Sequence, residues 1–228
     1  MAEVAEATGA MEWIAKILGY GILASNTTLK VPQIRKVVQA KATTGLSAMA
    51  LYLDVFLYLN AAMYNITMGN PLSAWGELLI VIVQNVALVL LLWRYSLPAP
   101  SLAAKAGAVL MLAAHVAISL NLPPGYRYLL PTLNLPCMII TRIAQIRKNM
   151  ANGHTGLLST TSLIMNISTV LVRVFTTVVL VGWDWNILRA YGLSVTSNGV
   201  LLGQIAYYGA NTSKVMAEQG QGDEKKGR

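Results

Sequence analysis

Apolar runs of about 20 residues, separated by short stretches that hold most of the charges, constrain this chain more than any other feature. A run of that length is what an α-helix needs to cross a bilayer. Only 11% of the residues are charged and 55% are hydrophobic, whereas soluble domains carry about twice that charge. A soluble helical core would instead alternate apolar and polar faces. The sequence therefore predicts a polytopic all-α membrane protein.

Seven spans are predicted, with Pro- and Gly-rich turns such as 69–73 and 121–125 between several of them. They are Trp13–Val38, Leu46–Ile66, Ala74–Tyr95, Leu102–Leu120, Tyr126–Met150, Leu157–Val181 and Ile187–Ala210. The segment before them, residues 1–12, is acidic and lacks the positive n-region of a cleavable signal peptide. We therefore expect the first span to be retained.

The positions of lysine and arginine predict the orientation. One predicted side carries Arg35, Lys36, Lys41, Arg94, Lys105, Arg147, Lys148, Lys214, Lys225, Lys226 and Arg228. The other carries Lys16, Arg127 and Arg189. Because basic loops favour the cytosol, we expect a cytosolic tail over 211–228 and a lumenal segment over 1–12. Tryptophans near the predicted interfaces are expected to anchor the spans there; they are Trp13, Trp75, Trp183 and Trp185.

An internal repeat is visible in QIRKVVQAKATTGLS (33–47) and QIRKNMANGHTGLLS (145–159). A cation precedes each block by three residues (Lys30 and Arg142), and a polar residue follows each by seven (Asp54 and Asn166). Chance convergence of two basic loops is the alternative. We expect two parallel three-helix repeats, 13–95 and 126–210, joined through a linker helix within 96–125, in a 3+1+3 arrangement. Repeats of this kind place a site near the midplane where they meet.

Four sequence blocks together resemble the PQ-loop superfamily, which includes the SWEET sugar transporters. They are KVPQIRKVV with TTGLS (30–47), NPLSAWGE (70–77) with Gln84, NGHTGLLS (152–159) with RVFT (173–176), and SNG with Gln204 and Tyr208 (197–208). The second repeat has Ala144-Gln145 where the family has Pro-Gln. The WGE and NGHTG blocks resemble the branch needed for mannose-phosphate-dolichol utilization.

That resemblance implies a SWEET-like fold and a role at the membrane of the endoplasmic reticulum. Proteins of the branch are needed for lumenal enzymes to use mannose- and glucose-phosphate-dolichol, in N-glycan, O-mannose, C-mannose and GPI-anchor assembly. Its expected partners are the lipid-linked sugar and glycosyltransferases. Lys225 and Lys226 form a dilysine pattern that coat proteins would read as a retrieval signal, unless they only serve topology.

Polar residues inside the spans are the candidates for function, because they are costly in a bilayer unless paired or facing water. Asn26, Lys30 and Gln33 are predicted to share one face of the first helix. Pro32 is expected to kink that helix and act as a hinge beside Gln33 and its counterpart Gln145, unless it only marks a helix terminus.

Asp54 is a carboxylate inside the second span, and Lys30 is its predicted partner. Arg142 and Asn166 are the counterparts in the second repeat. One interpretation is that the four residues bind a sugar phosphate. The other is that Lys30 and Asp54 form a structural ion pair.

Arg173 is the strongest candidate for contact with a phosphate, since a guanidinium binds phosphate in a bidentate manner. The alternatives are snorkelling to the interface or a pair with Glu77. The lumenal motif Trp75-Gly76-Glu77 places that carboxylate in the first turn of a helix.

Amide side chains in the third helix of each repeat suit recognition of sugar hydroxyls. They are Asn85 in the first repeat, and Asn198 and Gln204 in the second. Asn85 is a predicted partner of Asn198 across the repeats. In SWEET-like relatives an asparagine at the place of Asn198 lines the sugar pocket. The alternative is hydrogen bonding between helices.

No nucleophile–base pair, metal-ligand cluster or phosphate-binding loop is apparent, so neither an enzyme nor a resident cofactor is expected. No basic face with interleaved aromatics suggests nucleic acid, and the single cysteine, Cys137, excludes an intrachain disulfide. Besides the dolichol-linked role, two functions remain open: a transporter of sugars or cationic amino acids, and a non-transporting scaffold of the glycosylation machinery.

Overall fold

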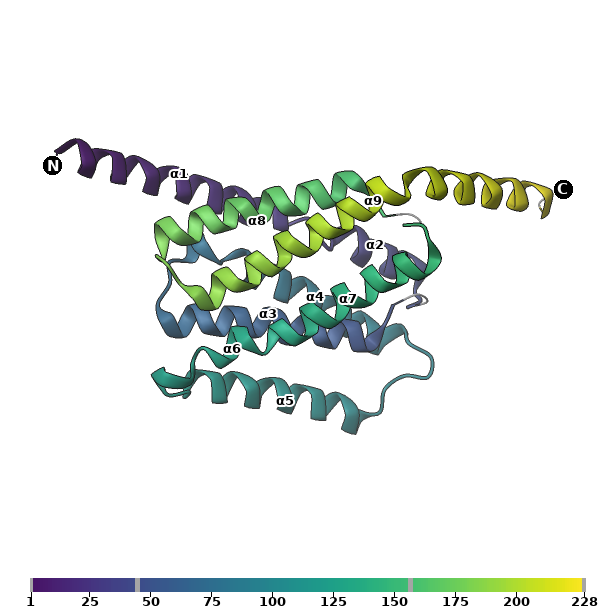
Figure 1. The fold of residues 1–228 in the computed structure, drawn as a ribbon. Helices are drawn as coiled ribbons and strands as arrows, with labels where there is room; N and C mark the ends of the chain where they lie inside the picture. The colour runs from purple at the N-terminus through teal and green to yellow at the C-terminus, as the bar shows by residue number, and fades with distance from the viewer. Residues whose placement is uncertain (1, 44–45, 156–157, 227–228) are drawn as a thin grey trace. The chain divides into compact units, whose positions relative to one another are not determined.

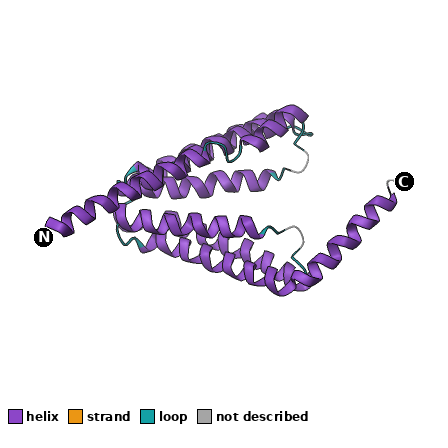
Figure 2. Ribbon diagram, turned by 90° about the horizontal axis from the view of Figure 1, so that it is seen from above, coloured by secondary structure: helices purple, strands orange, loops and turns teal. Residues whose placement is uncertain are grey.

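The computed structural model describes the backbone of residues 2–43, 46–155 and 158–226, and the side chains of residues 9–43, 46–155 and 158–215. All regular structure within these ranges is helical (Figures 1 and 2). The α-helices are α1 (Ala2–Asn26), α2 (Val31–Ala40), α3 (Ala48–Met68), α4 (Glu77–Tyr95), α5 (Leu102–Leu120), α6 (Leu129–Thr132), α7 (Asn134–Asn152), α8 (Thr160–Leu180) and α9 (Trp185–Lys226). Two 3₁₀ turns, η1 (Leu72–Ala74) and η2 (Pro124–Tyr126), precede α4 and α6.

The predicted helix starts agree best with the structure where a capping residue lies at the helix boundary. α5 has the predicted bounds, and the Ser101 hydroxyl accepts a hydrogen bond from the Ala104 backbone N–H. Ser47 caps α3 in the same way through Ala50. At the other end of α3, Gly69 adopts φ 71°, a left-handed conformation that glycine tolerates at a helix C-terminus.

The first predicted span, Trp13–Val38, is not one helix, so this prediction was wrong. α1 ends at Asn26, a turn covers residues 27–30, and α2 begins at Val31. Pro32 lies in the first turn of α2, where a missing backbone N–H leaves no hydrogen bond unmade. The interruption therefore comes before the proline, and Asn26, Lys30 and Gln33 do not share one helical face.

The terminal helices are longer than the sequence pattern predicted. α1 already begins at Ala2, and α9 continues past Ala210 to Lys226. The first extension is rich in Ala and Glu, and the second in Glu, Gln and Lys; these residues favour helix and outweigh the glycines among them. The predicted segments 1–12 and 211–228 are thus helical over their described backbone.

The described contacts divide the chain into two units. Unit 1 comprises Met1–Asn134 with Phe175–Asn186, and unit 2 comprises Leu135–Val174 with Ile187–Arg228. In unit 1, α3 packs against α4, α5 and α6, and α4 also packs against α1 and α2. A core cluster joins α2, α3 and α4; its buried members are Val37, Leu51, Val55, Leu88, Val89 and Leu92.

Two glycines allow α1 to approach the start of α4 closely. A Cβ atom on Gly19 would lie 2.1 Å from the carbonyl oxygen of Ser73 in η1. A Cβ on Gly76 would lie 2.8 Å from the Leu72 carbonyl oxygen and 2.9 Å from a methyl carbon of Leu23 in α1. The central glycine of the WGE motif is therefore required by packing.

Unit 2 is held by hydrogen bonds between α9 and the end of α7. Asn149 Nδ2 donates to Gln204 Oε1 at 2.9 Å, and Gln204 Nε2 donates to the Ile146 carbonyl at 3.0 Å. Beyond α7, Asn211 donates to the Gly153 carbonyl at 2.6 Å. Gln204, a predicted ligand residue, thus connects two helices.

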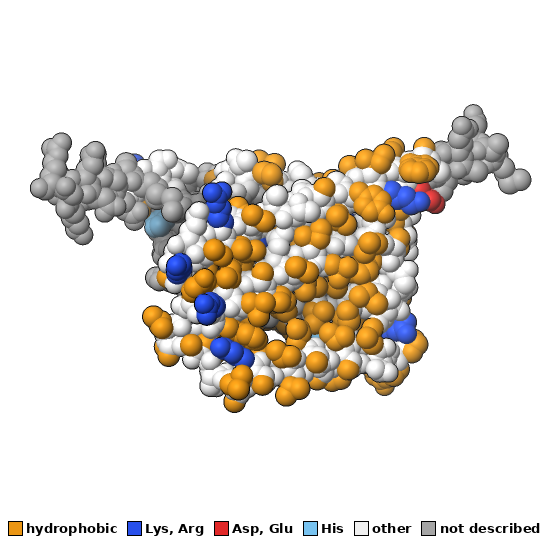
Figure 3. All heavy atoms as spheres, turned by 180° about the vertical axis from the view of Figure 1, so that it is seen from behind, with side chains coloured by type: hydrophobic (Ala, Val, Ile, Leu, Met, Phe, Trp, Pro, Cys, Tyr) orange, Lys and Arg blue, Asp and Glu red, His pale blue; other side chains and the backbone are white. Residues whose placement is uncertain are grey.

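Four helical segments are long and apolar enough to cross a membrane: Glu77–Tyr95, Leu102–Leu120, Pro124–Asn152 and Thr160–Leu180. Figure 3 shows a face covered largely by hydrophobic side chains, with most of the visible lysine and arginine along one edge and others at the opposite edge. Exposed apolar area on this scale marks contact with lipid or another protein. The helical segments and this surface support a multi-pass membrane protein.

Candidate functional site

The predicted pair of Lys30 and Asp54 is present in unit 1. Lys30 Nζ lies 3.3 Å from Asp54 Oδ2, and their side chains are 23% and 38% exposed. The pair joins the turn before α2 to the second turn of α3. Because each charge already has its opposite, the geometry favours the structural interpretation over an open phosphate site.

Gln84 stabilises the interruption between α1 and α2, a role the sequence did not reveal. Its Oε1 accepts from the Lys30 backbone N–H at 2.8 Å. Its Nε2 donates to the carbonyl oxygens of Asn26 and Thr27 at 2.9 and 2.8 Å. A broken helix exposes backbone groups that need partners, and this side chain of α4 supplies them.

The tryptophan of the WGE motif is a core residue. Trp75 is 7% exposed and packs with Ala62 and Ala74, so its predicted role as an interfacial anchor was wrong. Its indole Nε1 donates to the Asn70 carbonyl at 2.9 Å, which satisfies the buried N–H. Glu77 opens α4, as the helix-dipole interpretation predicts.

Three buried asparagines carry polar atoms without partners among the described residues. In Asn60 this atom is Oδ1, while its Nδ2 donates to Asn134. Asn85, on α4 in unit 1, is 0% exposed, and neither its Oδ1 nor its Nδ2 has a hydrogen-bond partner. Asn198, on α9 in unit 2, is also 0% exposed; its Nδ2 donates to the Ser194 carbonyl, whereas its Oδ1 has no partner. An unsatisfied buried amide is costly, so the two predicted ligand residues, Asn85 and Asn198, are candidates for ligand recognition.

Arg173 lies on α8 in unit 2 and is 4% exposed. Snorkelling requires an exposed guanidinium, so this alternative does not fit the structure. The predicted pair with Glu77 and the predicted partnership of Asn85 with Asn198 each join residues of different units, and both stay predictions.

The second-repeat counterparts differ from their first-repeat equivalents. Asn166 on α8 is exposed, whereas Asp54 is half-buried. Arg142 and Gln145 are half-buried on α7, which runs unbroken where α1 and α2 are interrupted. The sequence repeat therefore does not reproduce the helix break, and only the first repeat has proline at that point.

An open pocket of about 510 Å³ lies at one end of unit 1. It is lined by Tyr64, Met68, Asn70, Val181, Trp183, Asp184, Trp185 and Asn186. Tyr64 donates to Asp184 Oδ2 at 2.6 Å, and Asn186 Nδ2 donates to the Tyr64 hydroxyl at 3.1 Å. Sequence reasoning missed this site because its residues lie more than 100 positions apart.

No group of three or more metal-ligating side chains occurs in the described part of the chain. The side chains of Lys225 and Lys226 lie outside the described residues.

Comparison with known proteins supports the fold. Residues 14–74 match the family described as PQ loop repeat; this stretch begins in α1 and ends in η1. A eukaryotic SWEET transporter, solved at 3.7 Å, superposes with a TM-score of 0.67 at 14% identity, over 90% of this chain and 99% of that chain. The fold is SWEET-like. Structural similarity at 14% identity is evidence for the fold only. The match to the PQ loop repeat supports the resemblance seen in the first repeat.

Proposed function

We propose that this chain is a PQ-loop membrane factor of the endoplasmic reticulum that handles dolichol-phosphate-linked mannose and glucose for lumenal glycosylation. It does so by moving or presenting the lipid-linked sugar, and it catalyses no reaction itself. The chain is arranged as 3+1+3 helices, with a lumenal N-terminus and a cytosolic C-terminus.

Asn85 carries this proposal. Its amide is fully buried, and both polar atoms lack partners among the described residues. A purely structural amide between helices would be hydrogen-bonded, because an unmade bond costs about 1–3 kcal/mol. Sugar hydroxyls both donate and accept, so they match both atoms of the amide.

Arg173 is the proposed contact for the phosphate of the lipid. It is a buried cation on a helix long and apolar enough to span a membrane. Intramembrane arginines mark ligand pathways or ion pairs, and a guanidinium fits a phosphate in a bidentate manner.

The choice of a dolichol-linked ligand is supported by the sequence blocks. The WGE motif, with its buried tryptophan and its glycine required by packing, resembles the mannose-phosphate-dolichol utilization defect protein, as do NGHTG (152–156) and RVFT (173–176). Glycosyltransferases that consume the lipid are the proposed partners.

Transport of a small solute is the second candidate. The SWEET-like fold favours it, since the superposed protein is a transporter. The unpartnered amide of Asn85 would serve a free sugar equally well.

Re-expression in cells that lack their own utilization factor tests the proposal. The size of lipid-linked oligosaccharides is compared between the intact chain, Arg173→Ala, Asn85→Leu and the exposed-site control Gln39→Leu, at matched protein levels. We expect full-length oligosaccharide with the intact chain and the control, and truncated oligosaccharide with the other two.

Two outcomes separate the alternatives. If the intact chain reaches the endoplasmic reticulum and restores nothing, the dolichol proposal fails, and sugar uptake into proteoliposomes tests the transporter. If it restores full-length oligosaccharide and Arg173→Ala does so equally, the phosphate contact is wrong and a scaffold role gains support.

A further inference from the structure

We propose that the pocket between the end of α3 and the start of α9 binds a pyranose sugar. The pocket belongs to unit 1 and shares no residue with the buried amide of Asn85. Its volume of about 510 Å³ falls within the usual range for small-molecule sites.

The aromatic side chains provide the first part of the argument. Trp183 and Trp185 are 70% and 69% exposed, and their ring centroids lie 5.5 Å apart with the planes inclined by 37°. Indole rings offer rigid apolar area at little cost in side-chain entropy. The C–H face of a pyranose ring is the complementary surface, because it loses contact with water when it stacks on an indole.

The polar side chains determine what kind of ligand fits. Asn70 donates its Nδ2 to Asn65, and Asn186 donates its Nδ2 to Tyr64. The side-chain oxygens (Oδ1) of Asn70 and Asn186 accept no hydrogen bond from the described part of the chain, so both can accept one from a ligand. The pocket therefore offers mainly acceptors.

Asp184 adds further acceptor capacity and a negative charge. Its Oδ1 accepts from the Asn186 backbone N–H at 2.9 Å, and its Oδ2 accepts from Tyr64. An ionised carboxylate has about four acceptor positions, so about two remain for a ligand. A ligand with several hydroxyl donors satisfies these groups, whereas a phosphate placed here would be repelled by the carboxylate.

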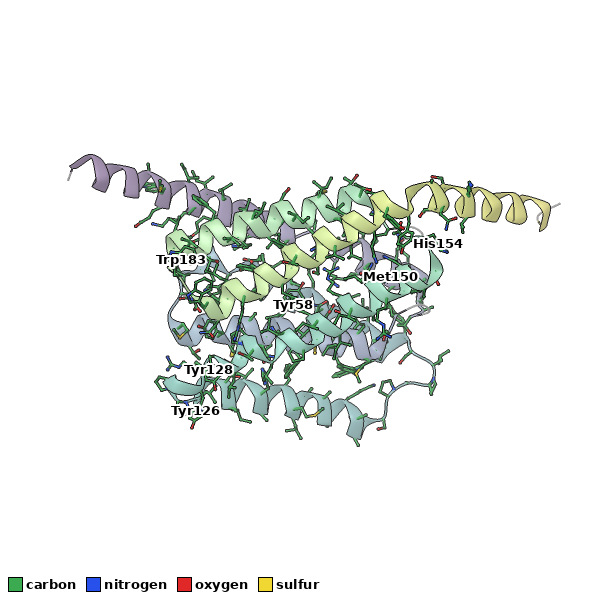
Figure 4. The ribbon with its side chains drawn as sticks, in the orientation of Figure 1. Tyr58, Tyr126, Tyr128, Met150, His154 and Trp183 are labelled. Atoms are coloured by element: carbon green, nitrogen blue, oxygen red, sulfur yellow. The ribbon has the colours of Figure 1, made fainter. Side chains whose placement is uncertain are left out.

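The location agrees with a sugar that arrives from the aqueous side. Figure 4 shows Trp183 at the end of unit 1 where Tyr126 and Tyr128 also lie, whereas Tyr58 lies midway along α3. Aromatic side chains gather at membrane–water interfaces. The ligand could be a free sugar or the sugar of a polyprenyl-phosphate lipid, because both present the same ring to this pocket. Only the lipid-linked ligand depends on the proposed function.

Titration calorimetry on the purified chain in lipid nanodiscs tests the pocket. The probes are methyl α-D-mannopyranoside, citronellyl phosphoryl mannose and citronellyl phosphate. We expect both mannose-bearing probes to bind at a site that Trp183→Ala weakens. Citronellyl phosphate, whose phosphate is proposed to contact Arg173, should bind more weakly, and Trp183→Ala should not change its binding. Tighter binding of the lipid-linked probe assigns a lipid source, and equal binding assigns a free sugar.

The variants separate a sugar site from a membrane anchor. Trp183→Ala and Asn186→Leu are expected to weaken binding of the mannose-bearing probes at least tenfold. Trp13→Ala removes an indole that is 69% exposed on α1, and it should leave binding unchanged.

Three results overturn the proposal: no binding of either mannose-bearing probe to the folded chain, equal losses in Trp183→Ala and Trp13→Ala, or binding of citronellyl phosphate as tight as that of its mannose conjugate. The titration uses purified protein, so a failure to restore oligosaccharides in cells contradicts the proposed function while leaving a positive titration intact.

Discussion

The hydroxyl of Tyr64 donates a hydrogen bond of 2.6 Å to the carboxylate of Asp184, a residue 120 positions later in the chain. Tyr64 is 2% exposed, so the bond lies at the boundary between the core of unit 1 and the open pocket. It connects α3 to the residue that precedes α9.

Tyr64→Phe is expected to lower stability by about 1.5–3 kcal/mol, because it removes a hydrogen bond to a charged acceptor while retaining the ring. Thermal unfolding of the detergent-solubilised protein measures the loss. Tyr20→Phe, at a residue 54% exposed, is the control and should have little effect. Equal unfolding temperatures for the two variants would contradict the role assigned to Tyr64.

Gln84→Leu should destabilise the chain more than any exposed amide replacement. It leaves the Lys30 N–H and the carbonyls of Asn26 and Thr27 without this partner. Each buried group left unsatisfied costs about 1–3 kcal/mol. Gln39→Leu makes the same chemical change at an exposed position of α2, and its unfolding temperature should stay near that of the parent. The prediction fails if both variants unfold together.

Asn85→Leu should raise stability and abolish function. Replacing an unpartnered buried amide with an apolar side chain of similar size removes a desolvation cost of about 1–3 kcal/mol. Gains in stability at the expense of activity are typical of binding residues. Unfolding temperature and oligosaccharide rescue, measured on the same variant, test both halves.

Asn60→Leu is the matched comparison for Asn85→Leu. Asn60 is also 0% exposed, but its Nδ2 donates to Asn134 Oδ1 at 2.9 Å. Its replacement leaves that acceptor unsatisfied, so the change in stability should have the opposite sign. A loss of stability in both variants would show that Asn85 has a structural partner.

Gly19→Ala should destabilise the chain, since the new methyl group would lie 2.1 Å from the Ser73 carbonyl oxygen and α1 would have to move. We expect a cost of about 1–3 kcal/mol, typical of overpacking. Gly21→Ala on the same helix meets nothing within 4 Å, and it should stabilise by about 0.5–1 kcal/mol through helix propensity. Opposite shifts in unfolding temperature confirm the close approach.

The pair of Lys30 and Asp54 is expected to act as a unit. Lys30→Met or Asp54→Asn alone leaves one charge without its opposite in a largely apolar region, whereas the double variant leaves none. We expect the double variant to restore oligosaccharides better than either single variant. If all three fail equally at matched expression, both charges belong to a ligand site.

The sequence predicted the features that depend on local pattern. The bounds of α5 follow from an apolar run between Ser101 and a Pro/Gly turn. The partnership of Lys30 with Asp54 could be predicted because few other charges lie within the first two spans. Such arguments need only spacing and the cost of an isolated charge in a bilayer.

The features that depend on distant partners could not be predicted. The break before Pro32 is stabilised by Gln84, which lies 54 positions after Lys30. Trp75 was expected at an interface, but the bond to Asn70 and the packing of Ala62 bury it. The pocket brings Tyr64 to Asp184, and no periodicity signals that contact.

The three hydrogen bonds of Gln84 connect the end of α1 to the start of α2 through one side chain of α4. All three are made by the Gln84 side chain. They hold the Asn26 and Thr27 carbonyls at one end of the turn and the Lys30 N–H at the other. The amide of Gln84 is rigid and planar. A displacement that breaks its bond to the Lys30 N–H would therefore also weaken its bonds to the Asn26 and Thr27 carbonyls. A single side chain therefore couples the two ends of this turn, and the loss of Gln84 would remove all three bonds at once.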